Sequence, residues 1–109
     1  MKVKEKEHSY IITKVTDSIE DFIHKIENQY TTYKSRHLIL DLGNHADVAD
    51  LVLFEPLSQQ HKSNKKSIVL IVKDTEFTEF ENEYVTVVPT IQEAYDIIEM
   101  EEIERDLGF

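Results

Sequence analysis

The chain contains 109 residues, and its 40% hydrophobic content is sufficient for one compact core, so we expect a single domain over residues 1–109. It has no cysteine, which excludes disulfides, thiolate metal sites and a cysteine nucleophile. A formal net charge of −10 disfavours nucleic acids and anionic lipids, because binding to either depends on basic groups. No apolar run is long enough for a membrane span or a secretion signal, so we expect a cytoplasmic protein without nucleic-acid or membrane partners.

The first predicted elements are a strand and a helix. Residues 9–15, SYIITKV, are rich in β-branched and aromatic side chains, which favours a strand. Asp17 stands three residues before Glu20, a pattern typical of a helix start, so a helix is expected over residues 18–30. The apolar residues of this helix recur at helical spacing and are Ile19, Phe22, Ile23, Ile26 and Tyr30.

A buried strand and a proline-containing helix are predicted next. HLILDL at 37–42 is apolar without alternation, as expected for a strand covered on both faces, and Gly-Asn at 43–44 can turn the chain after it. The following helix is expected within residues 51–64, with Leu53, Phe54 and Leu57 facing the core. Pro56 fits only the first turn of a helix, where its missing backbone N–H needs no partner, so this helix should start near 52–55.

Two more strands complete the predicted sheet. SIVLIVK at 67–73 is continuously apolar, residues 74–82 can form at most a short helical turn, and YVTVV at 84–88 is the last strand. Apolar strands that alternate with helices predict an α/β fold with a four-stranded, mostly parallel sheet, in which at least the three later strands are parallel. The expected core residues are Phe22, Leu38, Leu40, Phe54, Val69, Ile71, Val85, Val87 and Ile98.

The predicted terminal helix is acidic. Thr90 and Glu93 form a capping box for a helix over about 90–107. In residues 90–109, seven acidic side chains accompany one basic side chain, Arg105. We interpret these acids as a solvated helix face, with a docking surface as the alternative.

The loop after the strand 37–42 collects candidate chemical groups. Because ligands of parallel sheets gather at the carboxyl ends of the strands, His45, Asp47 and Asp50 could form a weak metal-dependent active site in residues 43–51. No His-x-His or His-x-x-x-His pair places two imidazoles together, so a polar turn without metal or cofactor is the simpler interpretation. The five histidines are scattered along the chain as His8, His24, His37, His45 and His61.

Asp41 supports a phosphotransfer alternative. Receiver domains carry a phosphorylated aspartate at the end of an inner strand, and Asp41 ends such a strand here. They also need an acidic pair after the first strand to hold a divalent cation, whereas this chain offers Lys14 and a single Asp17 there. Since Gly-x-Ser-x-Gly and glycine-rich phosphate motifs are also missing, we expect a protein that is not an enzyme.

The element order and three motifs resemble the STAS domain, the fold of anti-sigma factor antagonists. LILDL at 38–42 is similar to the strand before the family's functional loop, DVADL at 47–51 occupies the place of its Asp-Ser-Ser-Gly-Leu motif, and VTVVPTIQEAYDII at 85–98 resembles its last strand and helix. The resemblance implies helices packed mainly on one face of the sheet, with apolar sheet surface left for a partner or a second copy. It also implies a bacterial regulatory module that binds a protein partner, such as an anti-sigma factor, a kinase or another regulator.

This chain departs from the STAS motif at the position of phosphorylation. Ala49 stands where a partner kinase phosphorylates a serine in the family, Val48 replaces a second serine and Asp50 replaces the glycine. A one-residue shift of the register would place Asp50 at the phosphosite instead. The sequence therefore predicts a protein-binding module without the usual phosphorylation switch, whose contact residues are Asn44, His45, Asp47, Ala49, Asp50 and Leu51.

The chain is also similar to small STAS-like proteins that carry a ribonuclease Z label. That metallo-hydrolase activity requires a His-x-His-x-Asp-His cluster, which this sequence lacks. We therefore predict no ribonuclease activity for this chain.

Overall fold

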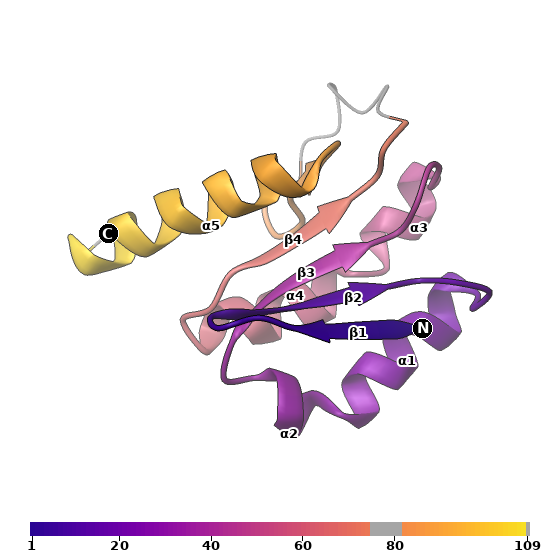
Figure 1. Ribbon diagram of the computed structural model, residues 1–109, viewed down its shortest axis with the longest axis horizontal. Helices are drawn as coiled ribbons and strands as arrows, with labels where there is room; N and C mark the ends of the chain where they lie inside the picture. Colours follow the sequence, from indigo (N-terminus) through magenta and orange to yellow (C-terminus); the bar gives the residue numbers. More distant parts are fainter. Residues whose placement is uncertain (75–81, 109) are drawn as a thin grey trace.

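In the computed structural model, which describes residues 1–74 and 82–108, five strands form one mixed sheet in the order β1-β2-β3-β4-β5 (Figure 1). β1 is antiparallel to β2, whereas β2, β3, β4 and β5 are mutually parallel. The predicted α/β class is confirmed, and the four predicted strands run parallel to one another, but the sheet as a whole has five strands and is mixed, which differs from the predicted four-stranded, mostly parallel sheet. The strands are β1 (Lys2–Glu5), β2 (Ser9–Thr13), β3 (His37–Asp41), β4 (Ile68–Ile71) and β5 (Val87–Val88).

β1 is the strand that the sequence did not predict. Its residues, KVKE, include one apolar side chain, and all four are exposed, so hydrophobic alternation gives almost no signal. The strand forms because it pairs with β2 in a hairpin, in which Val3 lies opposite Ile12 and Lys4 lies opposite Ile11. Partners that face each other across an antiparallel pair share a face of the sheet, so Lys4 lies on the same face as Ile11.

The predicted helix 18–30 corresponds to α1 (Ile19–Asn28), and its last residue begins a second, short helix that was not predicted, α2 (Tyr30–Tyr33). The N-cap of α1 is Ser18, whose hydroxyl accepts a hydrogen bond from the backbone N–H of Asp21 at 3.1 Å. The predicted helix start, with Asp17 as the residue before the helix, is therefore one residue too early. At a helix start the first N–H groups have no acceptor within the helix. A serine hydroxyl that accepts a hydrogen bond from the N–H three residues later satisfies one of them.

The predicted helix within 51–64 consists of α3 (Val48–Val52) and α4 (Glu55–Ser63). Pro56 lies in the first turn of α4, as predicted. The backbone N–H of Phe54 donates to the carbonyl of Leu51 at 3.1 Å, which closes α3 with a tight turn before α4 begins. The proline thus separates two helices, and the first of them starts earlier than the sequence indicated.

The last strand and helix follow the predicted order. Before β5, the backbone N–H groups of Tyr84 and Val85 both donate to the side chain of Asn82, so this segment turns locally and β5 keeps only two residues. α5 (Ile91–Asp106) is capped by Thr90, whose hydroxyl accepts from the backbone N–H of Glu93 at 3.2 Å, as predicted. The turn predicted at 74–82 lies largely outside the described residues.

The helices cover the two faces of the sheet unequally (Figure 1). Parallel strands in sequential order with right-handed crossovers place their connecting helices on one face, where α1, α2, α3 and α4 contribute to the larger core. α5 follows the last strand, is not a crossover, and packs on the opposite face against β3, β4 and β5. Within residues 1–74 and 82–108, we find no helix with the length and hydrophobicity needed to cross a membrane.

The core divides between these two faces. The larger cluster contains Phe22, Leu38, Leu40, Phe54 and Val85, and the smaller cluster includes side chains under α5. Two predicted core residues are not buried: Val87 is only partly buried because β5 lies at the edge of the sheet, and Leu53 is exposed on the segment after α3. The other predicted core residues are buried. The smaller cluster is formed by Ile39, Val69, Ile71, Val88, Ala94 and Ile98.

Candidate functional site

The predicted loop begins directly after β3 with a sharp turn. Gly43 has a φ of +87°, a backbone conformation that favours glycine, and its N–H donates to the carboxylate of Asp41 at 2.9 Å. The carbonyl oxygens of Gly43 and Asn44 then accept hydrogen bonds from the backbone N–H groups of Lys73 and Asp74. These bonds hold the start of the loop beside the end of β4, so the loop emerges at the carboxyl ends of the strands.

Two of the predicted polar residues meet in this loop. Nε2 of His45 lies 3.2 Å from Oδ1 of Asp47, and both side chains are 73% exposed. Within residues 1–74 and 82–108, no three histidine, aspartate or glutamate side chains are grouped as ligands for a metal. An exposed pair of this kind can hold a proton or contact a partner, but it does not exclude water as an active site does.

Asp47, Ala49 and Asp50 occupy the beginning of α3. Asp47 is its N-cap residue, and its backbone carbonyl accepts from the N–H groups of Asp50 and Leu51. The side chain of Ala49 is exposed, whereas that of Leu51 is fully buried in the larger core. The Leu51 side chain anchors α3 to the sheet, whereas the other predicted contact residues stay at least partly exposed, so partner contact through this loop remains a prediction.

The opposite side of α3 exposes apolar side chains that the sequence prediction did not single out. Val48, Val52 and Leu53 are 52%, 41% and 43% exposed, and Ala49 lies beside them. Positions 48 and 52, like positions 49 and 53, are one helical turn apart and so share a face. We call Val48, Ala49, Val52 and Leu53 the α3 surface. Their spacing was the available signal, but Leu53 was expected in the core.

The surroundings of Asp17 bear on the receiver alternative. Its carboxylate pairs with the ammonium of Lys25 and with the Met1 ammonium. The hydrogen bond from Lys25 is the main cause that holds the pKa of Asp17 well below its usual range. Asp17 is thus engaged with cations of the chain itself, and the Asp41 carboxylate accepts from the Gly43 backbone.

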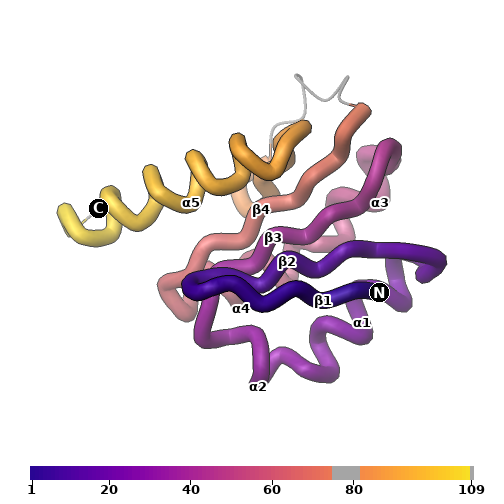
Figure 2. Tube along the Cα trace, in the orientation of Figure 1, coloured from indigo at the N-terminus to yellow at the C-terminus, as the bar shows by residue number. Residues whose placement is uncertain are grey.

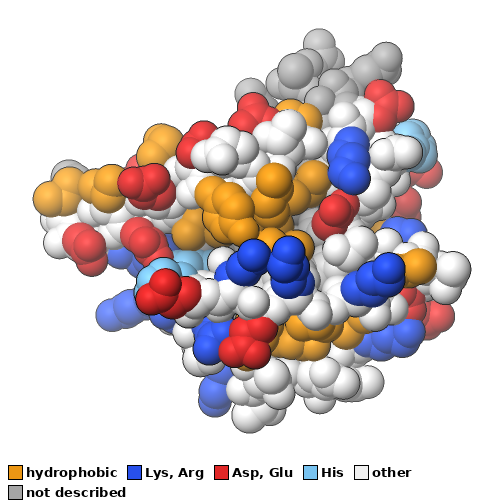
Figure 3. All heavy atoms as spheres, viewed as in Figure 1, with side chains coloured by type: hydrophobic (Ala, Val, Ile, Leu, Met, Phe, Trp, Pro, Cys, Tyr) orange, Lys and Arg blue, Asp and Glu red, His pale blue; other side chains and the backbone are white. Residues whose placement is uncertain are grey.

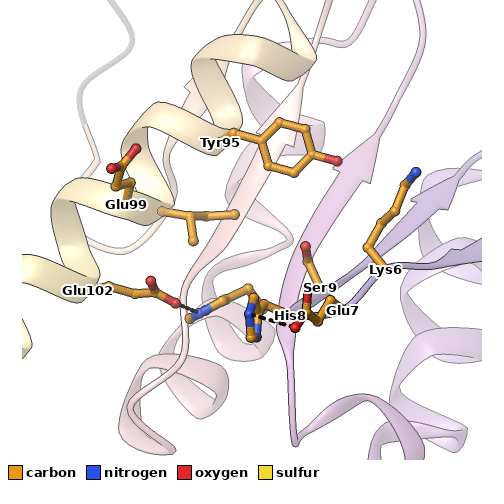
Figure 4. Close-up of a pocket in the computed structure, with 9 residues that line it drawn as sticks. Lys6, Glu7, His8, Ser9, Tyr95, Glu99 and Glu102 are labelled. Atoms are coloured by element: carbon orange, nitrogen blue, oxygen red, sulfur yellow. Dashed lines mark hydrogen bonds and ion pairs between the residues drawn. The ribbon is translucent and has the colours of Figure 1, made fainter.

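A hollow lies at the amino ends of the strands, opposite the loop that follows β3 (Figure 4). It has a volume of about 390 Å³, is open to solvent, and is bordered by the β1–β2 hairpin, the start of β3 and α5. The ring of Tyr95 extends from α5 toward the hairpin (Figure 4). We call this hollow the amino-end pocket, and its lining residues are Lys6, Glu7, His8, Ser9, His37, Tyr95, Ile98, Glu99 and Glu102.

Two lining residues of the amino-end pocket, Ser9 and His37, are polar and buried, and His37 is the titratable one. Its Nε2 contacts the carboxylate of Glu102, and its Nδ1 accepts a hydrogen bond from the backbone N–H of Ser67 at 2.9 Å. Nδ1 must be unprotonated to accept this bond, so the ring is neutral with its proton on Nε2. Burial lowers the pKa of His37, which favours the same neutral form.

His61 lies in a hydrogen-bond chain on the other face of the sheet. The Tyr30 hydroxyl donates to Nδ1 of His61 at 2.7 Å, and Nε2 of His61 donates to the carbonyl of Arg36 at 2.8 Å. The amide of Asn64 donates to the Tyr30 oxygen at 2.8 Å. Burial lowers the pKa of His61 to about 4, so this ring is also neutral near pH 7.

The two buried histidines therefore have structural contacts on both ring nitrogens. A general base needs a free lone pair directed at the proton that it removes. In His37 the Nδ1 lone pair already accepts from Ser67, and in His61 it accepts from Tyr30. These contacts link β3 to α5 and to the residue before β4, and they link α4 to α2, so they suit stabilisation of the fold more than proton transfer. The sequence prediction did not single out either residue.

Comparison with known proteins adds no assignment. No protein-family model matches the chain, and no curated protein matches it.

Proposed function

We propose that this chain is a non-enzymatic protein-binding module and that a protein partner contacts the α3 surface. The observation that carries the proposal is the exposure of three large apolar side chains, Val48, Val52 and Leu53, on one short helical segment. Single exposed apolar residues are common on soluble proteins, but adjacent ones surrounded by polar groups are typical of interaction sites. Burial of such side chains against a partner removes apolar surface from water and so contributes favourably to the free energy of binding.

The border of the α3 surface indicates the chemistry of the partner. Asn44, His45 and Asp47 are exposed on the loop before α3. Asp50, which lies within α3, is partly exposed. Since the whole chain carries a net charge of −10, a partner with an apolar centre and a neutral or basic border is favoured over an acidic one.

The resemblance to STAS domains supports a regulatory role for the same loop. We propose a partner such as an anti-sigma factor, a kinase or another regulator. Ala49 has no hydroxyl to accept phosphate, while Asp47 and Asp50 keep two carboxylates at the start of α3. Binding at the α3 surface would then be constitutive and would not depend on phosphorylation of residue 49.

The contact between His45 and Asp47 keeps a metal-dependent enzyme as the second candidate. A metal that binds only the folded protein raises its melting temperature in proportion to the logarithm of the metal concentration. Addition of Zn²⁺, Mn²⁺ or Mg²⁺ should leave the melting temperature unchanged under our proposal. A saturable rise that the His45→Ala variant abolishes would favour the enzyme instead.

The direct test compares captured proteins between variants. The full chain and its Val48→Ser/Val52→Ser variant are immobilised and exposed to an extract of the source cells, and each bound protein is identified and purified. We expect affinity for the partner to fall about tenfold or more in the variant, because loss of two central apolar contacts typically costs more than 1 kcal/mol.

Val3→Ser provides a matched control on β1, where Val3 is 46% exposed. This variant should bind the partner as tightly as the unmodified chain. Equal binding by all three proteins, with their folding verified by circular dichroism, would overturn the α3 surface as the contact site.

A further inference from the structure

A second exposed apolar row lies on α5, far from the α3 surface. The C-terminal half of α5 extends past the ends of the strands, whereas α3 lies at the other end of the molecule (Figures 1 and 2). Met100 and Ile103 on this half, and Leu107 at its C-cap, are 57%, 52% and 67% exposed. The side of α5 that packs on the sheet is a different one, occupied by Ala94 and Ile98.

The spacing makes these three residues one continuous face. They stand at positions i, i+3 and i+7 of the helix, the spacing by which a helix presents one seam to a neighbouring helix. We call Met100, Ile103 and Leu107 the α5 row. Hydrophobic and acidic side chains alternate on the protruding end of α5 (Figure 3).

The α5 row is surrounded by carboxylates. Asp96 and Glu104 lie one helical turn before and after Met100, and Glu99 lies one turn before Ile103. All three are exposed, and among residues 1–74 and 82–108 no cationic side chain forms an ion pair with any of them. An apolar seam with acidic borders is the pattern of one helix in a pair whose partner helix carries basic borders.

We infer that the α5 row binds a basic amphipathic helix of another protein. Such a helix would place apolar residues against Met100, Ile103 and Leu107, and lysine or arginine side chains against Asp96, Glu99 and Glu104. Charge complementarity selects this occupant. A second copy of the chain would bring the same carboxylates together, and an anionic membrane or a nucleic acid would add further negative charge.

This inference goes beyond the proposed function because it concerns a different surface. The α3 surface and the α5 row lie at opposite ends of the molecule (Figure 2), so both can be occupied at once. A chain with two such surfaces can connect two partners, which would make it an adaptor.

The probe for the α5 row is a synthetic helical peptide of leucine and lysine in a seven-residue repeat, labelled with a fluorophore. Its binding to the full chain is measured by anisotropy. Met100→Ser/Ile103→Ser should weaken binding about tenfold or more, because two anchors of the seam are removed. Glu99→Gln/Glu104→Gln should also weaken binding, and the effect should shrink as salt increases, since exposed charges are screened.

Two control peptides and one control variant make the test decisive. A peptide with glutamate in place of lysine, and one of the same composition with its leucines dispersed, should both bind much more weakly. Val48→Ser/Val52→Ser should leave binding of the original peptide unchanged. Equal binding of all three peptides, or equal loss in the α3 variant, would overturn the inference while leaving the α3 proposal to its own capture test.

Self-association provides the remaining check. Under the inference, sedimentation of the chain without peptide should give a monomer. A dimer that Met100→Ser/Ile103→Ser dissociates would show that a second copy occupies the α5 row, and would overturn the inference.

Discussion

His45 and Asp47, at the carboxyl end of β3, contact each other while both stay exposed. Near the amino ends of the strands, His37 and His61 are buried, and each of their ring nitrogens has a partner. Three of these four residues are histidines, yet only the exposed pair is free to contact another molecule. A histidine near a strand end is therefore available to another molecule only when its surroundings leave the side chain accessible.

Removal of His61 should have the largest effect on this comparison. His61→Ala leaves a cavity, deprives the Arg36 carbonyl of its donor and removes the acceptor of the Tyr30 hydroxyl. We expect the free energy of unfolding to fall by about 4 kcal/mol, from the cavity and the unsatisfied polar groups together. Urea denaturation measures this change. A loss below about 1 kcal/mol would contradict a structural role for the buried chain.

Acid should produce the next largest effect. The folded-state pKa of His61 is about 4, below its ordinary value of 6.5, so protonation favours the unfolded state. The stability that depends on neutral His61 is complete above about pH 6.5 and is lost as the pH falls toward 4, by on the order of 3 kcal/mol. His37 contributes with the same sign, because burial lowers its pKa too.

Unfolding free energies measured between pH 7 and pH 4 test this expectation. His61→Gln, which cannot be protonated in this range, should show a smaller decrease than the unmodified chain over the same interval. An identical pH dependence in the two proteins would show that His61 is not the group that titrates.

The smallest effect is expected at the exposed loop. His45→Ala removes one contact between two largely exposed side chains, so the free energy of unfolding should change by less than about 0.5 kcal/mol. Denaturation under the conditions used for His61→Ala provides the comparison. A loss close to that of His61→Ala would mean that the loop, too, is part of the stabilising network.

Local sequence patterns were sufficient for the centre of the fold. Residues 38–40 and 68–71 are buried in adjacent parallel strands, as their continuous apolar runs predicted. The patterns failed where pairing replaces hydrophobicity: β1 exists because it pairs with β2, and its KVKE sequence carries no apolar alternation. They also missed the division at Leu53, where a tight turn ends α3 before α4 begins at Glu55.

The candidate site was less predictable for a different reason. Polar residues pointed to this loop as the candidate site. The large exposed side chains of the segment are apolar, however, and Leu51 is buried. The contacts of the buried histidines join residues that are distant in the chain: His37 and Glu102 are 65 positions apart. No local pattern reports such a pairing, because it exists only after the strands and helices have packed.

The two edges of the sheet restrict how another chain can approach it. An edge strand offers unpaired backbone groups that another strand can extend, and lysines or a very short strand discourage this. β1 carries Lys2 and Lys4 at one edge, and β5 has only two residues at the other. Strand addition, the route by which many sheets recruit peptides or aggregate, is therefore disfavoured at both edges. The exposed apolar side chains on α3 and α5 are therefore not accompanied by an open strand edge that could act as a template for fibrils.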